Sequence, residues 1–319
     1  MITFSTIGTS WITESFIQAA KQTGKVRLSS IYSRSEETAR GFASNNGAER
    51  WYTDLDEMLK EDTDFVYLAS PNSVHFEQMI KVIKSKKHVF CEKPMVISEE
   101  QWRAVSELAK QEGVFVFEGY RHLYSPNYTV FKESLANIGQ VRSAILHYIQ
   151  YSSRYDAFKA GKEPNVFSKE FAGGALMDLG VYPLSMAVDL FGKPNRLEYF
   201  PVLLDNGADG SGTLVLTYKD FVVTILCSKI ADATIPSEIH GENGTITIDH
   251  IAPITKITHY NRETKQQHEL GKEQLELDMV YEADEFIRII MERDIHAYQY
   301  AMERSRQVVQ CLEMAQNKG

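Results

Sequence analysis

The chain has 319 residues, of which 43% are hydrophobic and 24% are charged. This balance is typical of globular proteins and excludes a disordered chain, and the length suits two domains of ordinary size. With 34 basic and 43 acidic side chains, the formal net charge is −9. Such a chain gains little from phosphate backbones or anionic lipid. We therefore expect a small-molecule partner, with no nucleic acid and no membrane.

The N-terminal residues 1–10 lack the basic segment and the long apolar run of a signal peptide. No apolar run approaches the roughly 18 residues that a membrane span needs. Cys91, Cys227 and Cys311 lie far apart without metal-ligand spacing, and the nine histidines are scattered. The odd number of cysteines favours a reducing compartment. We expect a cytoplasmic protein and no metal site.

Short apolar runs alternate with helix-period segments over the first 120 residues. Strands are predicted at 2–7, 26–32, 64–70, 88–92 and 114–118. Helices are predicted at 12–22, 36–46 and 73–85, and after Ser98, where Gln101 completes a capping box. Strands and helices of this length imply right-handed crossovers and a mostly parallel sheet buried on both faces. The pattern predicts an α/β fold with a doubly wound Rossmann domain over residues 1–120.

The pattern changes after about residue 125. Residues 141–151 predict a long strand, two more strands flank a hairpin turn at Lys219-Asp220, and Glu242-Asn243-Gly244 marks another turn. This antiparallel meander predicts an α+β domain over residues 121–319. Helical periodicity returns at about 275–292 and 297–316, and the last helix is free to pack back on the first domain.

The turn after the first strand is the first candidate cofactor site. A dinucleotide turn uses the pattern G-x-G-x-x-G, in which glycines permit close approach of the pyrophosphate to a helix N-terminus. This chain keeps Gly8 and has Ser10 and Thr13 at the other two glycine positions. The alternative is an ordinary strand-to-helix turn. Its position at the start of a βαβ series favours cofactor contacts from Gly8, Ser10, Trp11 and Ile12.

Ser33 and Arg34 follow the second strand. A site selective for NAD usually has Asp or Glu about 20 residues beyond the glycines, where the carboxylate holds the ribose hydroxyls and repels a 2′-phosphate. A hydroxyl and a guanidinium suit that phosphate instead. A solvated surface arginine is the alternative. The two residues favour NADP(H) as the cofactor, with NAD(H) possible.

Two more strand ends carry candidate residues. Because ligands cross the carboxyl edge of such a sheet, the turn after residues 64–70 is expected to contact the cofactor through Ser70, Pro71, Asn72 and His75. The next strand ends in Glu92-Lys93-Pro94. A lysine held at a strand end can bind the nicotinamide ribose and place positive charge beside the reacting group. An exposed loop lysine is the alternative.

In the second half, residues 173–182 read GGALMDLGVY. Asp178 and Tyr182 are four residues apart, so a helix here places both on one face. A phenol is a weak acid-base group unless a nearby cation stabilises its phenolate. Lys93 is the obvious cation if the two domains face each other. A buried tyrosine beside a capping aspartate is the alternative.

These segments together resemble the Gfo/Idh/MocA oxidoreductase family over nearly the whole chain, most specifically at Glu92-Lys93-Pro94 and at residues 173–184. The resemblance implies a Rossmann domain followed by an α/β domain whose open antiparallel sheet often forms the oligomer interface. A dimer or tetramer is expected. The resemblance also implies that Lys93 is the catalytic lysine, that the Lys93–Pro94 bond can be cis, and that Asp178 and Tyr182 face the substrate.

Within that family, many sugar and inositol dehydrogenases have histidine where this chain has Tyr182. The dihydrodiol dehydrogenase and glucose-fructose oxidoreductase branches have tyrosine, and this chain resembles them there. The dihydrodiol branch has tryptophan near the position of Arg121. Arg121 and His122 favour a more polar substrate, such as a sugar or polyol.

The resulting hypothesis is an NAD(P)-dependent oxidoreductase that transfers a hydride between nicotinamide and a carbon bearing a hydroxyl or carbonyl group. Tyr182 is the general acid in reduction and the general base in oxidation. Lys93 stabilises its phenolate and orients the ribose and the substrate oxygen. Asp178 anchors a substrate hydroxyl or orients Lys93. The alternatives are an NAD-linked inositol or sugar dehydrogenase of the same family and a non-catalytic dinucleotide sensor.

Overall fold

The computed structural model describes residues 1–316, which divide into two compact units. The first unit contains Met1–Gly119 and Leu275–Glu303, and the second contains Tyr120–Gln274 and residues 304–316. A single boundary at residue 120 therefore misplaces residues 275–303, which belong to the first unit. The last helix, α10 (Ile295–Gln316), begins in the first unit and ends in the second.

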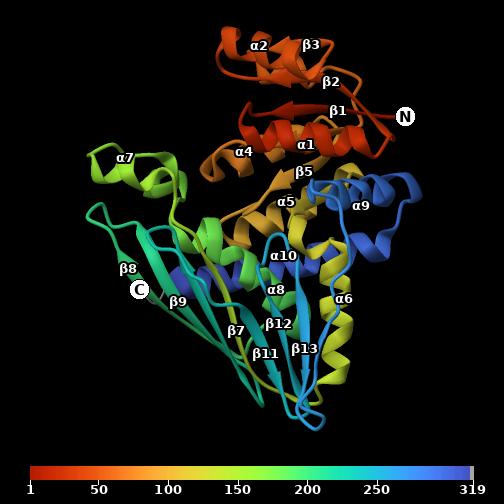
Figure 1. Ribbon diagram of the computed structural model, residues 1–319. Coiled ribbons are helices and arrows are strands. Elements are labelled where there is room, and N and C mark those ends of the chain that lie inside the picture. Colours follow the sequence, from red (N-terminus) through yellow and green to blue (C-terminus); the bar gives the residue numbers. More distant parts are fainter. Residues whose placement is uncertain (317–319) are drawn as a thin grey trace. The chain divides into compact units, whose positions relative to one another are not determined.

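The first unit contains a six-stranded parallel sheet with the strand order β3-β2-β1-β4-β5-β6 (Figure 1). Its strands are β1 (Ile2–Ile7), β2 (Val26–Tyr32), β3 (Arg50–Tyr52), β4 (Phe65–Leu68), β5 (His88–Glu92) and β6 (Val116–Gly119). Its helices are α1 (Trp11–Gln22), α2 (Glu36–Asn46), α3 (Leu55–Met58), α4 (Asn72–Lys84), α5 (Glu99–Glu112) and α9 (Met279–Glu292). The sequence missed β3 and α3, because elements of three and four residues are too short to show a period.

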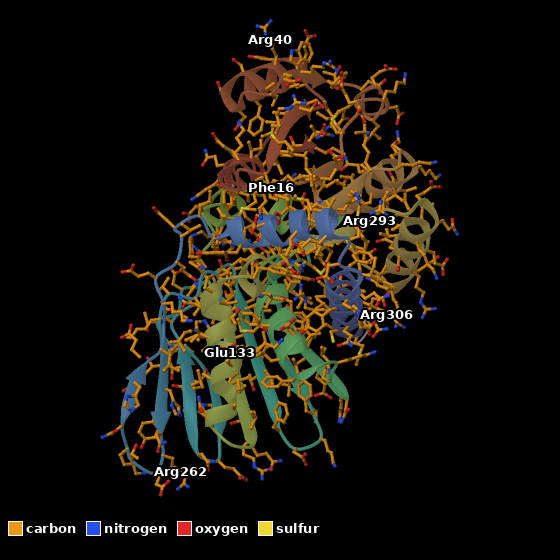
Figure 2. The ribbon with its side chains drawn as sticks, turned by 90° about the vertical axis from the view of Figure 1, so that its right-hand side faces the viewer. Phe16, Arg40, Glu133, Arg262, Arg293 and Arg306 are labelled. Carbon is orange, nitrogen blue, oxygen red and sulfur yellow. The ribbon has the colours of Figure 1, made fainter. Side chains whose placement is uncertain are left out.

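Aromatic packing explains why α9 belongs to the first unit. Phe16 of α1 stacks on Tyr67 of β4 with ring centroids 3.7 Å apart, and Figure 2 labels Phe16 on its helix. Phe286 of α9 meets Phe65 and Phe90 edge-on at 5.2 and 5.3 Å. All five rings are fully buried, and each aromatic side chain removes a large apolar area from water. The helix at 279–292 therefore completes the core of the first unit.

The second unit contains an eight-stranded sheet with the order β14-β13-β12-β11-β7-β10-β9-β8. Its strands are β7 (Val141–Ile149), β8 (Arg196–Leu203), β9 (Asp209–Thr217), β10 (Val222–Ser228), β11 (Ser237–Gly241), β12 (Gly244–Ile248), β13 (Ile257–Asn261) and β14 (Gln267–Glu269). All neighbouring pairs are antiparallel except β7 with β10. The predicted α/β fold, with a Rossmann domain and a second domain built on a mainly antiparallel sheet, is confirmed.

One face of this second sheet is covered by helices. The helical segments between the strands are η1 (Arg121–Leu123), α6 (Pro126–Ser134), η2 (Leu135–Asn137), α7 (Tyr155–Lys159), η3 (Asn165–Phe167), η4 (Lys169–Phe171), a π-helical turn (Leu176–Gly180) and α8 (Val181–Phe191). Helix α8 packs on β7 and β10, and α6 packs on β12 and β13. Figure 2 shows Glu133 on α6 and Arg262 in the turn between β13 and β14.

Within the stretch Lys169–Phe191, the most apolar 18-residue window has a mean hydropathy of 1.3, so that by length and composition the stretch could cross a membrane, whereas the sequence predicts no such span. However, 78% of its most apolar window is buried inside the protein. Burial of this extent is typical of the central helix of a folded domain. The hydropathy of the stretch is therefore explained by its place in the core of the second unit.

Candidate active site

The turn after β1 has the geometry that a pyrophosphate needs. Gly8 adopts φ +116°, and a Cβ at this position would lie 2.7 Å from the carbonyl oxygen of Ala69, so only glycine fits. Ser10 is the N-cap of α1, but its hydroxyl accepts no backbone N–H of the first turn and lies 3.4 Å from the Thr13 hydroxyl. Thr13, at the third glycine position of the pattern, is fully buried. These features fit an anion at the N-terminus of α1.

The other predicted side chains of this turn differ in exposure. Trp11 is 72% exposed, and Ile12 is half-buried. Trp11 is the first residue of α1, so its ring stands beside the helix N-terminus rather than in the core. The structure therefore leaves the indole available for a cofactor, and the contact stays a prediction.

The end of β2 presents the two residues predicted to select the cofactor. Ser33 donates its backbone N–H to the Tyr52 carbonyl of β3 at 3.1 Å. Arg34 is exposed in the short connection to α2, which Ser35 caps by accepting from Thr38. Because β1 and β2 are parallel neighbours, their carboxyl ends meet at one edge of the sheet. The Gly8 turn and Arg34 therefore share that edge.

His75 has a different role from the predicted one. Its imidazole is fully buried, with Nε2 2.8 Å from the Ser70 carbonyl oxygen and Nδ1 3.0 Å from the Pro94 carbonyl oxygen. Burial lowers the pKa of His75, and the two carbonyl contacts oppose that shift. The prediction of a cofactor contact through this side chain is wrong, because both ring nitrogens are engaged with the backbone. His75 instead ties the loop after β4 to the loop after β5.

The rest of the β4 loop stays a candidate for cofactor contact. The Ser70 hydroxyl donates to the Gln78 side chain of α4 at 2.6 Å. Pro71 is the N-cap of α4 and Asn72 is its first residue. Since β4 lies next to β1, this loop follows the same sheet edge as the Gly8 turn.

Lys93 is held at the end of β5 by bonds to its neighbours. The Lys93–Pro94 peptide is cis, as the resemblance implied. The Tyr67 hydroxyl donates to the Glu92 carboxylate at 2.6 Å, and the Met95 N–H donates to the buried Glu118 carboxylate at 2.7 Å. With His75 on the Pro94 carbonyl, the backbone around Lys93 is fixed on both sides. The point from which the Lys93 side chain leaves the backbone is therefore fixed.

The sequence does not predict two of these supports, Tyr67 and Glu118. Tyr67 and Glu118 lie in apolar runs that predict only strands, and their partners are 25 and 23 residues away. Burial, followed by the charge of Glu92, raises the pKa of Tyr67 well above its ordinary value. The phenol therefore stays protonated and remains the donor to Glu92.

In the second unit, Asp209 fixes the start of the segment that carries Asp178 and Tyr182. Its carboxylate accepts from the Leu176 N–H at 2.7 Å and from the Tyr199 hydroxyl at 2.5 Å. Gly174, at φ +124°, lies so close that a Cβ there would collide with this carboxylate. Burial raises the pKa of Asp209, and these hydrogen bonds oppose the shift. The glycines of the motif therefore allow a strand carboxylate to reach the helix start.

Asp178 lies in the π-helical turn that leads into α8, and Tyr182 lies one turn later. The Lys229 ammonium forms an ion pair with the Asp178 carboxylate. The Tyr182 side chain packs between His122 and Tyr148, with ring centroids at 5.0 and 5.2 Å. Single π-helical turns of this kind occur frequently at functional sites. The predicted pair therefore lies on one continuous helical segment, with its roles still a prediction.

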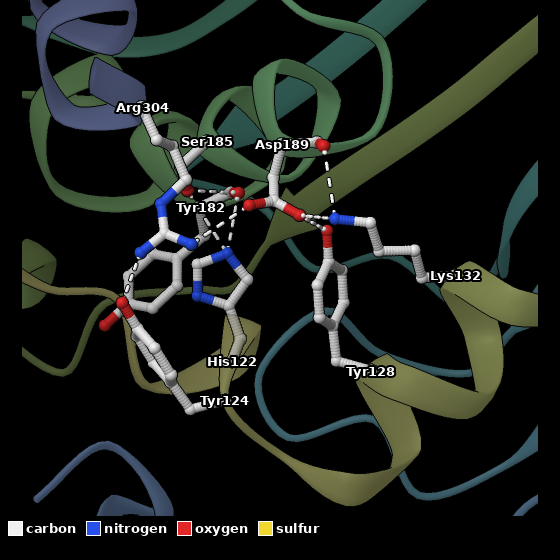
Figure 3. Close-up of polar contacts among 8 residues, drawn as sticks. All are labelled: His122, Tyr124, Tyr128, Lys132, Tyr182, Ser185, Asp189 and Arg304. Carbon is white, nitrogen blue, oxygen red and sulfur yellow. Dashed lines mark hydrogen bonds and ion pairs between the residues drawn. The ribbon is translucent and has the colours of Figure 1, made fainter. Parts of the chain in front are cut away.

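His122 points its Nε2 atom at the backbone of Tyr182 (Figure 3). Its side chain is fully buried, and Nε2 lies 3.0 Å from the Tyr182 carbonyl oxygen and 3.2 Å from the Ser185 hydroxyl. Burial, followed by the charges of Arg304 and Arg121, lowers the pKa of His122 well below its ordinary value. The predicted substrate contact is wrong. A neutral His122 supports the backbone of Tyr182, whereas Arg121, in η1 and half-buried, stays a candidate for the substrate.

The far end of α8 is anchored by a buried charge network, also drawn in Figure 3. The Asp189 carboxylate accepts from Arg304 at 2.9 Å, from Tyr128 at 2.6 Å and from Lys132 at 2.7 Å. Burial alone would raise the pKa of Asp189, but Arg304 and the hydrogen bonds outweigh it and bring the pKa to about 2. Helices α6 and α10 are thereby fixed to α8, and with it the helix that carries Tyr182.

Two domain models match the chain in order. Residues 2–120 match the oxidoreductase family with an NAD-binding Rossmann fold, and residues 135–247 match the GFO/IDH/MocA C-terminal domain. The chain is 38% identical, over its whole length and 97% of the relative, to scyllo-inositol 2-dehydrogenase (NADP(+)) IolU of Bacillus subtilis. It is 28% identical to trans-1,2-dihydrobenzene-1,2-diol dehydrogenase of Xenopus tropicalis over 68% of the chain and 66% of the relative.

Solved structures share the fold. A 3-ketoreductase from Actinomadura kijaniata, in complex with NADP and TDP-benzene, has a TM-score of 0.86 at 20% identity and covers 99% of this chain and 97% of its own. An NAD binding oxidoreductase from Klebsiella pneumoniae has a TM-score of 0.86 at 19% identity, covering 99% and 96%. The two matched domains and the full-length relative together show that this chain belongs to the Gfo/Idh/MocA family of NAD(P)-dependent oxidoreductases that act on CH–OH groups.

Proposed function

We propose that the protein is an NADP-preferring dehydrogenase of a cyclitol or sugar, with scyllo-inositol as the first substrate to test. The observation that carries this proposal is the 38% identity over the full chain to an NADP-linked scyllo-inositol dehydrogenase. D-xylose 1-dehydrogenase (NADP(+)) 2 of Haloferax volcanii, 27% identical over 61% of the chain and 58% of the relative, supports the wider class of polyhydroxylated substrates.

In this proposal, Tyr182 moves the proton and Lys93 supplies the positive charge. When bound, nicotinamide accepts or supplies the hydride. During oxidation, Tyr182 removes the hydroxyl proton as its carbon loses the hydride, and during reduction it returns that proton to the carbonyl oxygen. The Lys93 ammonium stabilises the phenolate and holds the oxygen. Asp178 accepts a hydrogen bond from another substrate hydroxyl, and Arg121 is a further substrate contact.

The cofactor is held by the carboxyl edge of the first sheet. The pyrophosphate is bound at the N-terminus of α1, by the turn that contains Gly8, Ser10, Trp11 and Ile12. The loop of Ser70, Pro71 and Asn72, together with Glu92 and Lys93, takes the nicotinamide side. Ser33 and Arg34 bind the 2′-phosphate, to which the guanidinium donates charge-assisted hydrogen bonds.

The experiment is a steady-state assay at the absorbance band of the reduced nicotinamide. We expect oxidation of scyllo-inositol, with kcat/KM at least about tenfold higher for NADP than for NAD, the advantage of one extra charge-assisted hydrogen bond. D-xylose and trans-1,2-dihydrobenzene-1,2-diol are the comparison substrates. Failure to oxidise all three, or a preference for NAD, contradicts the proposal.

Replacing Arg34 with alanine should raise the KM for NADP by about 10- to 100-fold, because the 2′-phosphate loses its cation. The KM for NAD should stay within about threefold, since NAD lacks that phosphate. Arg40→Ala is the matched control, because Arg40 is exposed on the neighbouring helix α2. Equal effects of Arg34→Ala on both cofactors would rule out the phosphate contact.

We also propose that the protein forms a homodimer through the uncovered face of the second sheet. Strand register places Ile145 opposite Thr224 and Val222 opposite Ser143, so Ile145 and Val222 share a face. These two side chains are each 39% exposed, and Phe200 on β8 is 56% exposed. Such apolar exposure marks an interface. Sedimentation should give twice the chain mass for wild type and a single chain for Phe200→Asp; a monomeric wild type contradicts the proposal.

The cytoplasm is the proposed location. Cys91, Cys227 and Cys311 are buried free thiols, as expected in a reducing compartment. Fractionation of expressing cells tests this location, and recovery from the periplasm or the medium contradicts it.

A further inference from the structure

Lys229 follows the last residue of β10, where the sheet fixes its backbone. Its N–H donates to the Gly210 carbonyl at 2.8 Å, and its own carbonyl accepts from the Ser152 N–H at 2.9 Å. The two bonds join Lys229 to the start of β9 on one side and to the segment after β7 on the other. The side chain therefore leaves from a rigid base.

The ammonium of Lys229 lies in a closed environment. Its side chain is 5% exposed and forms an ion pair with the Asp178 carboxylate. The Nζ atom is 5.7 Å from the ring centroid of Phe167, which is itself fully buried. Taking an ammonium out of water is costly and is tolerated only with a well-placed partner. Asp178 is the acceptor that the described residues provide.

The two side chains of this ion pair differ in their exposure to solvent. The Asp178 side chain is 33% exposed, against 5% for Lys229. The ion pair of Lys132 and Asp189 has the opposite arrangement, with the lysine 43% and the aspartate 2% exposed. In the pair of Lys229 and Asp178, the group that a ligand can reach is therefore the Asp178 carboxylate.

We propose that Lys229 is a positioning residue that holds the Asp178 carboxylate, ionised and in one orientation, for a hydroxyl next to the reacting carbon of the substrate. This inference rests on the proposed function and narrows it to vicinal diols and α-hydroxy ketones. Asp178 in the π-helical turn and Tyr182 in the first turn of α8 are four residues apart on one continuous helical segment, a separation of about one helical turn. Two neighbouring oxygens of one small ring can therefore meet the two side chains together.

The position of the Asp178 carboxylate, set by Lys229, affects the affinity for the substrate. An ionised carboxylate accepts a short, charge-assisted hydrogen bond that is about twice as strong as a neutral one. Without Lys229, the carboxylate loses its fixed partner and turns toward water, so the substrate must order it on binding. Loss of Lys229 should therefore raise KM more than it lowers kcat, whereas loss of the proton-transfer group lowers kcat.

The test compares K229M, K229Q, D178N and K229M/D178N by oxidation of scyllo-inositol with NADP. We expect K229M to raise the KM for scyllo-inositol about 10- to 100-fold, with a smaller change in kcat and with NADPH affinity, measured by fluorescence, within twofold of wild type. K229Q, which keeps a donor for Asp178, should recover part of the loss. In the D178N background, K229M should add less than threefold, because Lys229 acts through Asp178.

K256M is the matched control, since it also removes a lysine from an ion pair in the second domain, the exposed pair of Lys256 and Glu269, and should leave KM unchanged. Thermal melting follows folding in each variant, and K229Q decides the question if K229M does not fold. The inference is overturned if K229Q and K229M both stay within twofold of wild type, or if their losses multiply with that of D178N. If the wild-type protein does not oxidise scyllo-inositol, the proposed substrate is refuted. The same variants are then assayed with the diol or sugar that the wild-type protein oxidises.

Discussion

Replacing Tyr182 with phenylalanine should lower kcat by about 10²- to 10⁴-fold, the usual contribution of a positioned general acid or base. The ring contacts with His122 and Tyr148 survive this change, because only the hydroxyl is removed. The KM for the polyol and the melting temperature should therefore change little. Steady-state kinetics in both directions, with NADP and with NADPH, measures the effect.

Tyr218→Phe is the matched control for Tyr182→Phe. The Tyr218 hydroxyl donates to the Gly192 carbonyl at 2.9 Å, at the opposite end of the same helix α8. This variant removes a phenol from the support of α8 and should retain nearly full kcat. If Tyr182→Phe also retains kcat, Tyr182 does not transfer the proton.

Replacing Lys93 with methionine should lower kcat/KM by at least about 100-fold, because the developing negative charge on the phenol and substrate oxygens loses its cation. The backbone around Lys93 should keep its course, since His75, Glu118 and Tyr67 hold it through atoms that the substitution does not touch. Kinetics and NADPH titration by fluorescence separate the loss of chemistry from a loss of cofactor affinity.

Lys84→Met is the control for Lys93→Met, because Lys84 lies exposed in the last turn of α4 and its charge has no proposed role. We expect wild-type kinetics from it. Retained turnover in Lys93→Met, or a loss confined to NADPH binding, would assign Lys93 to the cofactor alone.

The sequence predicts the first sheet well because each of its longer strands carries its own signal. Buried runs such as residues 65–68 and 89–91 are continuous and apolar, and two helices of this unit are marked by caps at Ser35 and Ser98 that the structure contains. Local chemistry decides these elements, so one sequence suffices. The missing β3 and the returning segment 275–303 depend on packing against distant strands, which local periodicity does not report.

The same difference between local signals and long-range contacts holds at the candidate site. Lys93, Asp178 and Tyr182 stand in short motifs whose residue types indicate chemistry. Asp209 and Lys229 act through partners 33 and 51 residues away, and no spacing rule connects them. A lysine at the end of the apolar strand 222–228 was a signal of this kind, since an ammonium beside a buried strand needs a nearby acceptor.

His75 and His122 show how residue type misleads. Both stand in motif loops, and an imidazole there suggests contact with a ligand. The structure buries both rings, with both nitrogens of His75 and the Nε2 atom of His122 at backbone carbonyls. Each histidine thereby sets the position of a neighbouring candidate, Lys93 or Tyr182, instead of touching a ligand itself.

The most direct test of the account combines the two changes in one protein, K93M/Y182F, and compares its kcat/KM for scyllo-inositol and NADP with both single variants. If the ammonium serves the proton transfer of the phenol, removing the second group costs almost nothing once the first is gone. We predict that the double variant falls within about threefold of the worse single variant. A double variant whose loss equals the product of the two single losses would show that the residues act independently and would contradict the account.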